Sequence, residues 1–376
     1  MHIDKRSPLG VSASIILALC LSNAAQADDG FNTTINGYGT IGGTYTGNSS
    51  LTYIQSPTEY KATNSQFDLG VDSRIGVQGT FAYGDKISIV VQEEAKRRGS
   101  ENFSLGTEWA FFQYKPTDDL KLRLGRVVLA AFLTSDYREV GYAQPWFTAP
   151  NELYGLESIE NIDGAQALYH IGLGPVGLDL QGAYGSASSD ILVNGATDHL
   201  TSKSVSNVSA ALTYGSFLFR VAETTLPLPS VLPLGPTTLV SYVNRDKFLS
   251  VGFQYDNGKA LLLSEWAKRS ENNIPLLNIP TGASTQWYVA GGWRFGKLTP
   301  LLSYATFKTG DSLIYGPTTS SSSTPSFTLR YDVITNVALK AQISSVQGRN
   351  STEWASPSTT SNERVNVFSL GADFVF

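Results

Sequence analysis

Alternation of apolar and polar residues is the feature that most constrains this chain. Runs of about ten residues keep this alternation from residue 33 to the last residue. In the final run, residues 363–376, Leu370 and Phe374 share one parity, while Ser369 and Asp373 share the other. A period of two residues is that of a β-strand, whose successive side chains point to opposite faces. The chain is therefore predicted to be all-β, with one apolar and one polar face on most strands.

Composition favours a membrane barrel over a globular β-fold. No apolar run reaches the roughly 18 residues that a membrane-spanning helix needs, and amphipathic helices are almost absent. Aromatic residues make up 11% of the chain, which also holds 35 glycines. Alternating segments with these residues are typical of a transmembrane β-barrel. The alternative is a soluble β-sandwich or β-helix, which the absence of a short sequence repeat disfavours.

The spacing of the alternating runs predicts sixteen strands, with one hairpin more or fewer as the alternative. An even number places both termini at the same end, and closure into a barrel leaves no sheet edge in lipid. A barrel of this size encloses an aqueous lumen. We thus expect a 16-stranded antiparallel transmembrane β-barrel with short periplasmic turns and long extracellular loops. The strands are expected at 33–46, 66–82, 86–97, 104–115, 119–130, 163–172, 175–185, 203–214, 216–225, 245–256, 258–269, 284–295, 297–308, 326–334, 337–347 and 363–376. The long loops are expected at 47–65, 98–103, 130–163, 186–202, 226–244, 270–283, 309–325 and 348–362.

The N-terminus is predicted to be a cleaved secretory signal peptide, residues 1–27. Lys5 and Arg6 precede a short apolar stretch, and the stretch is followed by the A-x-A motif at residues 25–27. Cleavage after Ala27 leaves a single barrel domain, residues 28–376. The only cysteine, Cys20, lies in the removed part, so no disulfide is expected.

One long segment, residues 130–163, has no sustained period of strand or helix. A loop of this length in a compact fold is either functional or disordered, and its aromatic residues argue against disorder. The segment is also acidic. We expect it to fold inward and narrow the lumen as a constriction loop.

Two pairs of adjacent strands resemble the general diffusion porins of Gram-negative outer membranes. The strings SRIGVQG (73–79) and DKISIVVQEEA (85–95) resemble their second and third strands. EWAFFQYKP (108–116) and DLKLRLGR (119–126) resemble their fourth and fifth, and the terminal Phe376 matches the C-terminal signal of the family. In layout, the resemblance covers the whole chain after the signal peptide. The long segment 130–163 carries the string PNELYG (150–155) where those porins carry a Pro-Glu-Phe-Gly-like loop tip.

This resemblance implies a homotrimer in the outer-membrane lipid that passes small hydrophilic solutes and ions by passive diffusion. It also implies an acidic constriction loop that faces a basic patch on the barrel wall. The loop acids are Asp136, Glu139, Glu152, Glu157 and Glu160. The wall bases are Arg74, Lys121, Arg123 and Arg126. For each charge the alternative is a solvated or locally paired side chain.

Parity assigns further residues to the two faces of the wall. Inward-facing cations are expected at Arg220, Arg294, Arg330 and Lys340. Outward aromatics at the membrane interface are expected at Trp109, Trp287, Trp293, Phe217 and Phe327. In the loop, Tyr137, Tyr142 and Trp146 are expected to pack against the inner wall, with a sugar-stacking track as the alternative.

Other functions are disfavoured. The formal net charge of −5 argues against nucleic acid as a partner. After the signal peptide only His170 and His199 remain, and no G-x-S-x-G string or metal-ligand spacing is present, so neither an enzyme nor a cofactor is expected. A channel selective for a sugar, peptide or anion, and a purely structural or adhesive barrel, remain as alternatives. The net charge and the acidic loop favour a slight preference for cations.

Overall fold

The computed structural model describes residues 30–47, 66–98, 103–155, 159–193, 196–233, 239–270, 283–310, 320–349 and 363–376. The predicted signal peptide and Glu157 lie outside the described residues. Sixteen β-strands account for most of the described chain. The strands are β1 (Phe31–Thr46), β2 (Arg74–Tyr83), β3 (Ile87–Arg97), β4 (Phe103–Tyr114), β5 (Leu120–Val128), β6 (Asn161–Leu173), β7 (Val176–Val193), β8 (Ala196–Tyr214), β9 (Phe217–Pro233), β10 (Leu239–Asp256), β11 (Ala260–Ser270), β12 (Ala283–Trp293), β13 (Leu298–Thr309), β14 (Ser321–Ile334), β15 (Val337–Arg349) and β16 (Glu363–Val375).

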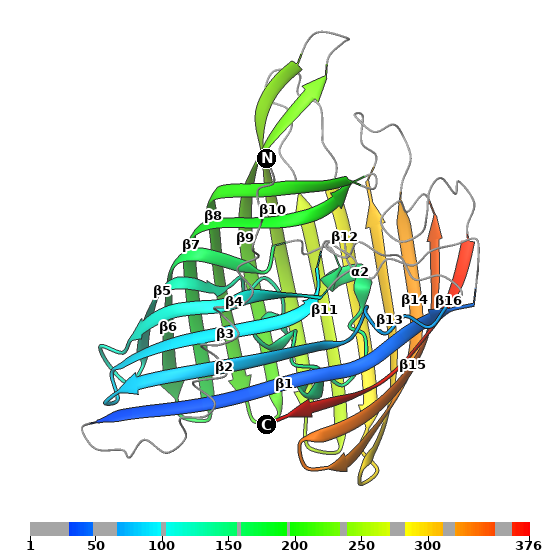
Figure 1. The fold of residues 1–376 in the computed structure, drawn as a ribbon, viewed down its shortest axis with the longest axis horizontal. Helices are drawn as coiled ribbons and strands as arrows, with labels where there is room; N and C mark the ends of the chain where they lie inside the picture. Colours follow the sequence, from blue (N-terminus) through cyan, green and yellow to red (C-terminus); the bar gives the residue numbers. More distant parts are fainter. Residues whose placement is uncertain are drawn as a thin grey trace, which may run out of the picture.

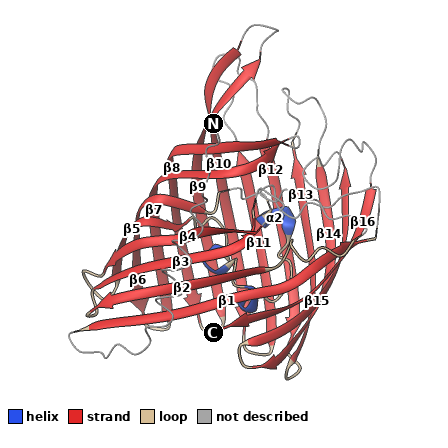
Figure 2. Cartoon of the chain, viewed as in Figure 1, coloured by secondary structure: helices blue, strands red, loops and turns tan. Residues whose placement is uncertain are grey.

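The strands form one closed antiparallel barrel (Figures 1 and 2). Each strand pairs with its neighbours in the chain, and β1 pairs with β16 from Tyr38↔Val375 to Thr46↔Val367. The prediction of a 16-stranded antiparallel barrel is confirmed. In the described ranges, no helix is long and apolar enough to cross a membrane.

The alternation in the sequence separates the two faces of the wall. In β12 the outward side chains are exposed and the inward ones are buried. The outward ones include Trp287 and Val289, whereas Gln286 and Tyr288 face the interior. Trp287, Trp293, Phe217 and Phe327 are exposed on the outer wall as predicted. Trp109 is an exception, because a bulge where β4 pairs with β3 turns it toward the interior cluster.

The short turns lie where the sequence predicted them. Six of the seven contain a residue with positive φ, a conformation that glycine and asparagine adopt most readily. These residues are Gly84, Gly174, Gly215, Gly258, Gly296 and Asn336.

Two predicted long loops are wrong. Most of 186–202 extends β7 and β8, and most of 226–244 extends β9 and β10. These segments are rich in Ser, Asn and Pro, but two strands can continue to pair with each other in water beyond the membrane. Pro227 and Pro229 lie in β9 past the last residue that pairs with β8, where a missing N–H costs no ladder hydrogen bond. The predicted second strand also begins later, at Arg74 rather than residue 66.

Candidate functional site: a loop inside the barrel

The segment between β5 and β6 folds into the barrel, as the sequence predicted. It contains the short helices η1 (Ser135–Tyr137), η2 (Gly141–Ala143) and α2 (Asn151–Tyr154). Its contacts are with inward side chains of the wall, and α2 lies within the barrel in Figure 1, against β12, β13 and β14. The segment lies two residues earlier than predicted at both ends, because β5 ends at Val128 rather than residue 130 and β6 begins at Asn161 rather than residue 163.

Wall side chains hold the first part of this loop by its backbone. The guanidinium group of Arg220 donates to the carbonyl oxygens of Ala130 (2.5 Å) and Phe132 (2.7 Å). The hydroxyl of Ser250 donates to the carbonyl of Ala131 between them (2.7 Å). Three consecutive carbonyls are therefore satisfied by β9 and β10, which fixes where the loop enters the lumen.

Lys340 of β15 holds the middle of the loop. Its ammonium group donates to the carbonyl oxygens of Gly141 (2.7 Å), Gln144 (2.8 Å) and Trp146 (3.0 Å). The same group lies 2.8 Å from the carboxylate of Asp373 on β16. A buried ammonium ion needs such partners, since an unpaired charge in the interior is costly.

Arg330 of β14 reinforces the same part. It donates to the carbonyls of Tyr142 (2.8 Å) and Gln144 (2.9 Å) and lies over the Tyr142 ring. Parity therefore predicted the side of Arg220, Arg330 and Lys340 correctly. What it missed is that these cations bind loop carbonyls. Arg294 instead pairs with Asp256 near the short turns, at 2.6 and 2.8 Å.

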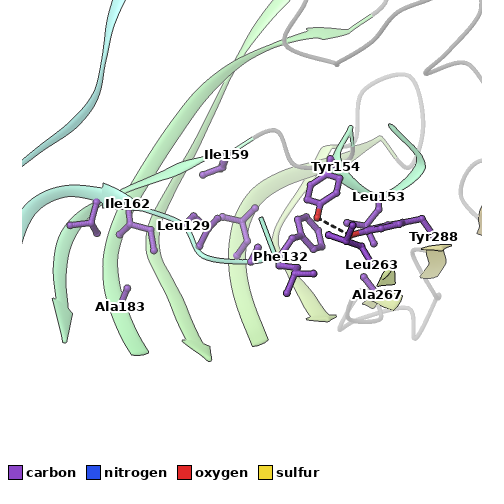
Figure 3. Packing of buried hydrophobic residues seen from close by; sticks show 14 of the residues in the cluster. Leu129, Phe132, Leu153, Tyr154, Ile159, Ile162, Ala183, Leu263, Ala267 and Tyr288 are labelled. Carbon is purple, nitrogen blue, oxygen red and sulfur yellow. Dashed lines mark hydrogen bonds between the residues drawn. The ribbon is translucent and has the colours of Figure 1, made fainter. Parts of the chain in front are cut away.

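Apolar contacts pack the loop against the opposite wall (Figure 3). Trp146 is buried, with its ring edge-on to Tyr288 of β12 at 5.6 Å between centroids. Tyr154 lies between Phe132 and Tyr288, and its hydroxyl donates to Glu265 of β11 (2.9 Å). Trp146 is thus a packing residue, as expected, and is not available for stacking on a sugar.

Two of the predicted loop acids meet the basic wall directly. Glu139 pairs with Arg74 of β2 and lies 3.2 Å from the ammonium group of Lys96 on β3. Glu160 lies 3.7 Å from Lys96 and pairs with Arg138 of the loop. Arg138 is also 3.5 Å from Glu139. The five side chains form one network that joins the loop to β2 and β3.

Two acidic residues of the wall, Glu94 and Glu108, extend this network through ion pairs with Lys96 and Arg98. Glu94 is buried, 2.9 Å from Lys96 and 3.2 Å from Arg98. Glu108 of β4 also pairs with Arg98. The sequence prediction of the basic wall did not include Lys96 and Arg98. Lys96 has the parity of Glu94, a signal that could have placed it inside the barrel.

The other predicted loop acids have different surroundings. Asp136 is exposed in the lumen, within electrostatic range of Arg123. Glu152 is buried at the far wall and accepts hydrogen bonds from Ser322 (2.9 Å) and Thr324 of β14. Glu152 is therefore an anchoring residue of α2, not a charge facing the basic wall.

The surroundings shift the pKa of the loop acids in opposite directions. Burial alone would raise the pKa of the Glu139 carboxyl, but Lys96, Arg74 and Arg138 hold it well below its ordinary value. Burial raises the pKa of Glu152, and the hydroxyl hydrogen bonds only partly offset this. Burial also raises the pKa of Tyr137 to about 12.

The remaining wall bases separate into two groups. Lys121 and Arg123 share the inward face of β5, and Arg123 donates to Gln113 (2.9 Å) and Gln166 (3.0 Å). Arg126 has the parity of the exposed Leu122 and Leu124, which places it on the outer face. There it makes a bidentate ion pair with Asp163 of β6, at 2.7 and 2.8 Å.

A cavity of about 140 Å³ lies between the loop and the wall of β1 to β3. Five basic and three acidic residues line it, among them Arg74, Lys96, Arg138, Glu139 and Glu160. Among the described residues, no group of three or more His, Cys, Asp or Glu side chains is arranged to hold a metal ion.

The chain matches no protein-family model and no curated protein sequence. Its fold does match solved structures. The anion-selective porin from Comamonas acidovorans is 13% identical, with a TM-score of 0.60 over 92% of this chain and 100% of that one. The outer membrane channel DcaP of Acinetobacter baumannii is 12% identical, with a TM-score of 0.61 over 94% and 99%. The trimer form of OmpT, an outer membrane protein of Vibrio cholerae, is 13% identical, with a TM-score of 0.57 over 93% and 100%. The chain therefore has the fold of Gram-negative outer-membrane porins.

Proposed function

We propose that the chain forms a water-filled channel in the outer membrane for passive diffusion of small hydrophilic solutes and ions. The observation that carries this proposal is the charged loop held inside a closed barrel. A segment anchored by Arg220, Lys340 and Arg330 narrows the lumen without depending on a ligand to hold it there. The narrowed passage then limits the size of the solutes that cross.

Charges on the two sides of the passage supply its selectivity. Asp136 is exposed on the loop, and the inward face of β5 carries Lys121 and Arg123. Opposed charges across a narrow aqueous path make a transverse field that favours polar, hydrated solutes over apolar ones. Asp136, Lys121 and Arg123 are thus the charges we assign to selectivity, and Glu139, Glu160 and Arg74 belong to the network that also fixes the loop.

The assembly and location follow from the same proposal. The signal peptide is removed after Ala27, and the barrel inserts into the outer membrane from the periplasm. The protein is proposed to be a homotrimer, since OmpT of the same fold has a trimer form. Catalysis has no part in the proposal. His170 and His199 each pair with a cross-strand aspartate at 2.7 Å, and among the described hydrogen bonds neither contacts a serine.

A second candidate is a channel selective for an anion. The cavity beside the loop favours it, because five basic residues line that cavity against three acidic ones. The similar porin from Comamonas acidovorans is described as anion-selective. In the sequence, however, the wall carries no ladder of arginines along one strand, so diffusion without a dedicated substrate remains the first proposal.

Single-channel recording in planar bilayers tests these two functions. A general channel conducts in proportion to salt concentration, and neither a neutral sugar nor phosphate blocks it at low concentration. Saturation of the current, or block by phosphate in preference to the sugar, would replace the general channel with the anion-selective one. A folded protein that conducts no ions would overturn both.

A further inference from the structure

Two arginines lie on opposite faces of β5, and each has a cross-strand partner on β6. The register places Arg126 opposite Asp163 and Arg123 opposite Gln166. On the outer face, the carboxylate of Asp163 offsets the charge of Arg126 within the wall. On the inner face, the partner of Arg123 is a neutral carboxamide. The lumen side of the same strand therefore keeps its positive charge.

Three wall side chains hold the guanidinium group of Arg123 in place. Its Nε donates to the carboxamide oxygen of Gln113 on β4 (2.9 Å), and its Nη1 donates to that of Gln166 (3.0 Å). The carboxamide nitrogen of Gln113 donates to the hydroxyl of Ser88 (3.4 Å), which orients the oxygen toward Arg123. The guanidinium carbon lies over the ring of Phe111, 4.7 Å from its centroid. A planar group held in this way loses little further freedom when it binds a ligand.

The Nη2 nitrogen of Arg123 is left for a ligand. Within the described ranges it has no hydrogen-bond acceptor, and no described carboxylate lies within ion-pair distance of the guanidinium group. Lys121, on the same inward face of β5, likewise forms no ion pair with a carboxylate that the structure describes. Elsewhere in the lumen Arg294 is paired with Asp256. The inward face of β5 thus presents positive charge that neutral groups orient but do not offset.

We propose that Arg123 is a binding subsite for the carboxylate group of small organic solutes, with Lys121 adding to the attraction. A guanidinium group forms strong, charge-assisted hydrogen bonds with carboxylate oxygens. A singly charged carboxylate fits better than a phosphate dianion, because the exposed Asp136 of the loop lies within electrostatic range of Arg123 and repels a second negative charge. The inference rests on the proposed channel function in that the solute has to reach the lumen.

Gln113 and Gln166 are positioning residues for this subsite. A glutamate at either position keeps an acceptor of nearly the same shape, but it supplies the negative charge that Asp163 supplies to Arg126 on the outer face. Gln166→Glu is therefore expected to remove carboxylate binding although Arg123 itself is unchanged. Gln113→Glu makes the same change from the other side of the guanidinium group, so a failure of one variant to fold leaves the other as the test.

Saturation-transfer NMR on the folded protein in non-ionic micelles measures the binding of propionate and of propionamide, which has the same shape without the charge. The wild type is expected to bind propionate about tenfold more tightly than propionamide. Arg123→Gln and the two glutamate variants should each bring the two affinities together. The outward Arg126→Gln removes the same charge from the other face of β5 and should keep the preference. Acetate should displace bound propionate better than phosphate does at the same concentration.

The ratio of the two affinities isolates the charge at Arg123, because a general change in the fold would alter the binding of propionamide as well. Equal binding of propionate and propionamide by the wild type would overturn the proposal. So would a preference that persists in folded Arg123→Gln or in a folded glutamate variant, a preference lost in Arg126→Gln, or phosphate that displaces propionate as well as acetate does. Single-channel conductance of the same samples tests the channel separately. Conduction without a preference for propionate refutes the subsite alone, and a preference without conduction refutes the proposed function alone.

Discussion

The ring of Phe147 lies directly over Gly371 on the inner face of β16. A methyl group built on Gly371 would be 2.6 Å from Cε2 of Phe147. Gly42 of β1 is the cross-strand partner of Gly371, and a methyl group there would be 2.6 Å from Cζ of the same ring. The two glycines leave room for a loop side chain at the seam where the barrel closes, so loop placement and barrel closure are coupled.

Replacement of Phe147 by Ala should loosen the loop at this seam. The variant loses the ring contacts, which we expect to lower the free energy of unfolding by roughly 2 kcal/mol. It should also raise the single-channel conductance, because the loop can move away from β1 and β16. Thermal unfolding in micelles and bilayer recording measure the two effects. Phe147→Leu, which keeps an apolar side chain, is the control, and an unchanged conductance in folded Phe147→Ala would contradict the coupling.

Replacement of Lys340 by Met should be more damaging. It removes the donor to three loop carbonyls and leaves the carboxylate of Asp373 buried without its cation. Breaking a buried ion pair on one side costs about 3–5 kcal/mol. Chemical unfolding should show this loss, and K340M/D373N should recover part of it. Equal stability of the single and double variants would mean that the ion pair is not what holds the loop.

The two loop acids Glu139 and Glu152 should respond to neutralisation in opposite ways. The pKa of Glu139 is lowered in the folded state, so its contribution is present above the unfolded pKa of about 4.3 and is lost as pH falls through the lower folded value. Glu139→Gln should therefore destabilise the protein at neutral pH by about 2 kcal/mol. The difference from wild type should shrink only below about pH 4.

The pKa of Glu152 is shifted in the opposite direction, because burial raises it above that of an unfolded glutamate. As pH rises from the unfolded pKa through the raised folded pKa, the unfolded state loses its proton more readily than the folded state, so the free energy of unfolding falls. Glu152→Gln should match the wild type in acid and be equally or more stable in alkaline buffer. Unfolding midpoints across a pH series compare each of the two variants with the wild type. If Glu152→Gln were less stable than the wild type by an amount that grows with pH, the raised pKa of Glu152 would be contradicted.

Asp136 and Arg123 should set ion preference rather than stability. Asp136 is exposed, and Arg123 faces it from the wall. Asp136→Asn should shift the reversal potential in a salt gradient toward anion permeation, and Arg123→Gln should shift it toward cations. The outward Arg126→Gln is the control and should leave the reversal potential unchanged. If Asp136→Asn also leaves it unchanged, Asp136 does not face the conducting path.

The strands could be predicted because lipid on one face and water on the other impose the same local pattern sixteen times. The pattern stops being informative beyond the membrane, which is why the outer parts of β7 to β10 were predicted as loops. Parity placed Arg220, Arg330 and Lys340 on the inner wall. It could not show that they bind loop carbonyls, because the path of the loop depends on contacts between residues as distant in sequence as Gly141 and Lys340.

The charges of the loop show the same limit. Local sequence placed Glu139 and Glu152 in one acidic set, yet tertiary contacts put Glu139 among cations and Glu152 among hydroxyl groups. Arg126 was grouped with Lys121 and Arg123, but it has the parity of the outward Leu124 and pairs with Asp163 outside.

The most direct test of the whole account is the single-channel conductance of a variant that lacks residues 134–156. This deletion removes η1, η2 and α2 while leaving all sixteen strands. If the loop narrows a water-filled passage, the deletion variant should conduct more than the wild type in the same salt and should admit larger sugars. A folded deletion variant with wild-type conductance would show that the loop does not limit the passage.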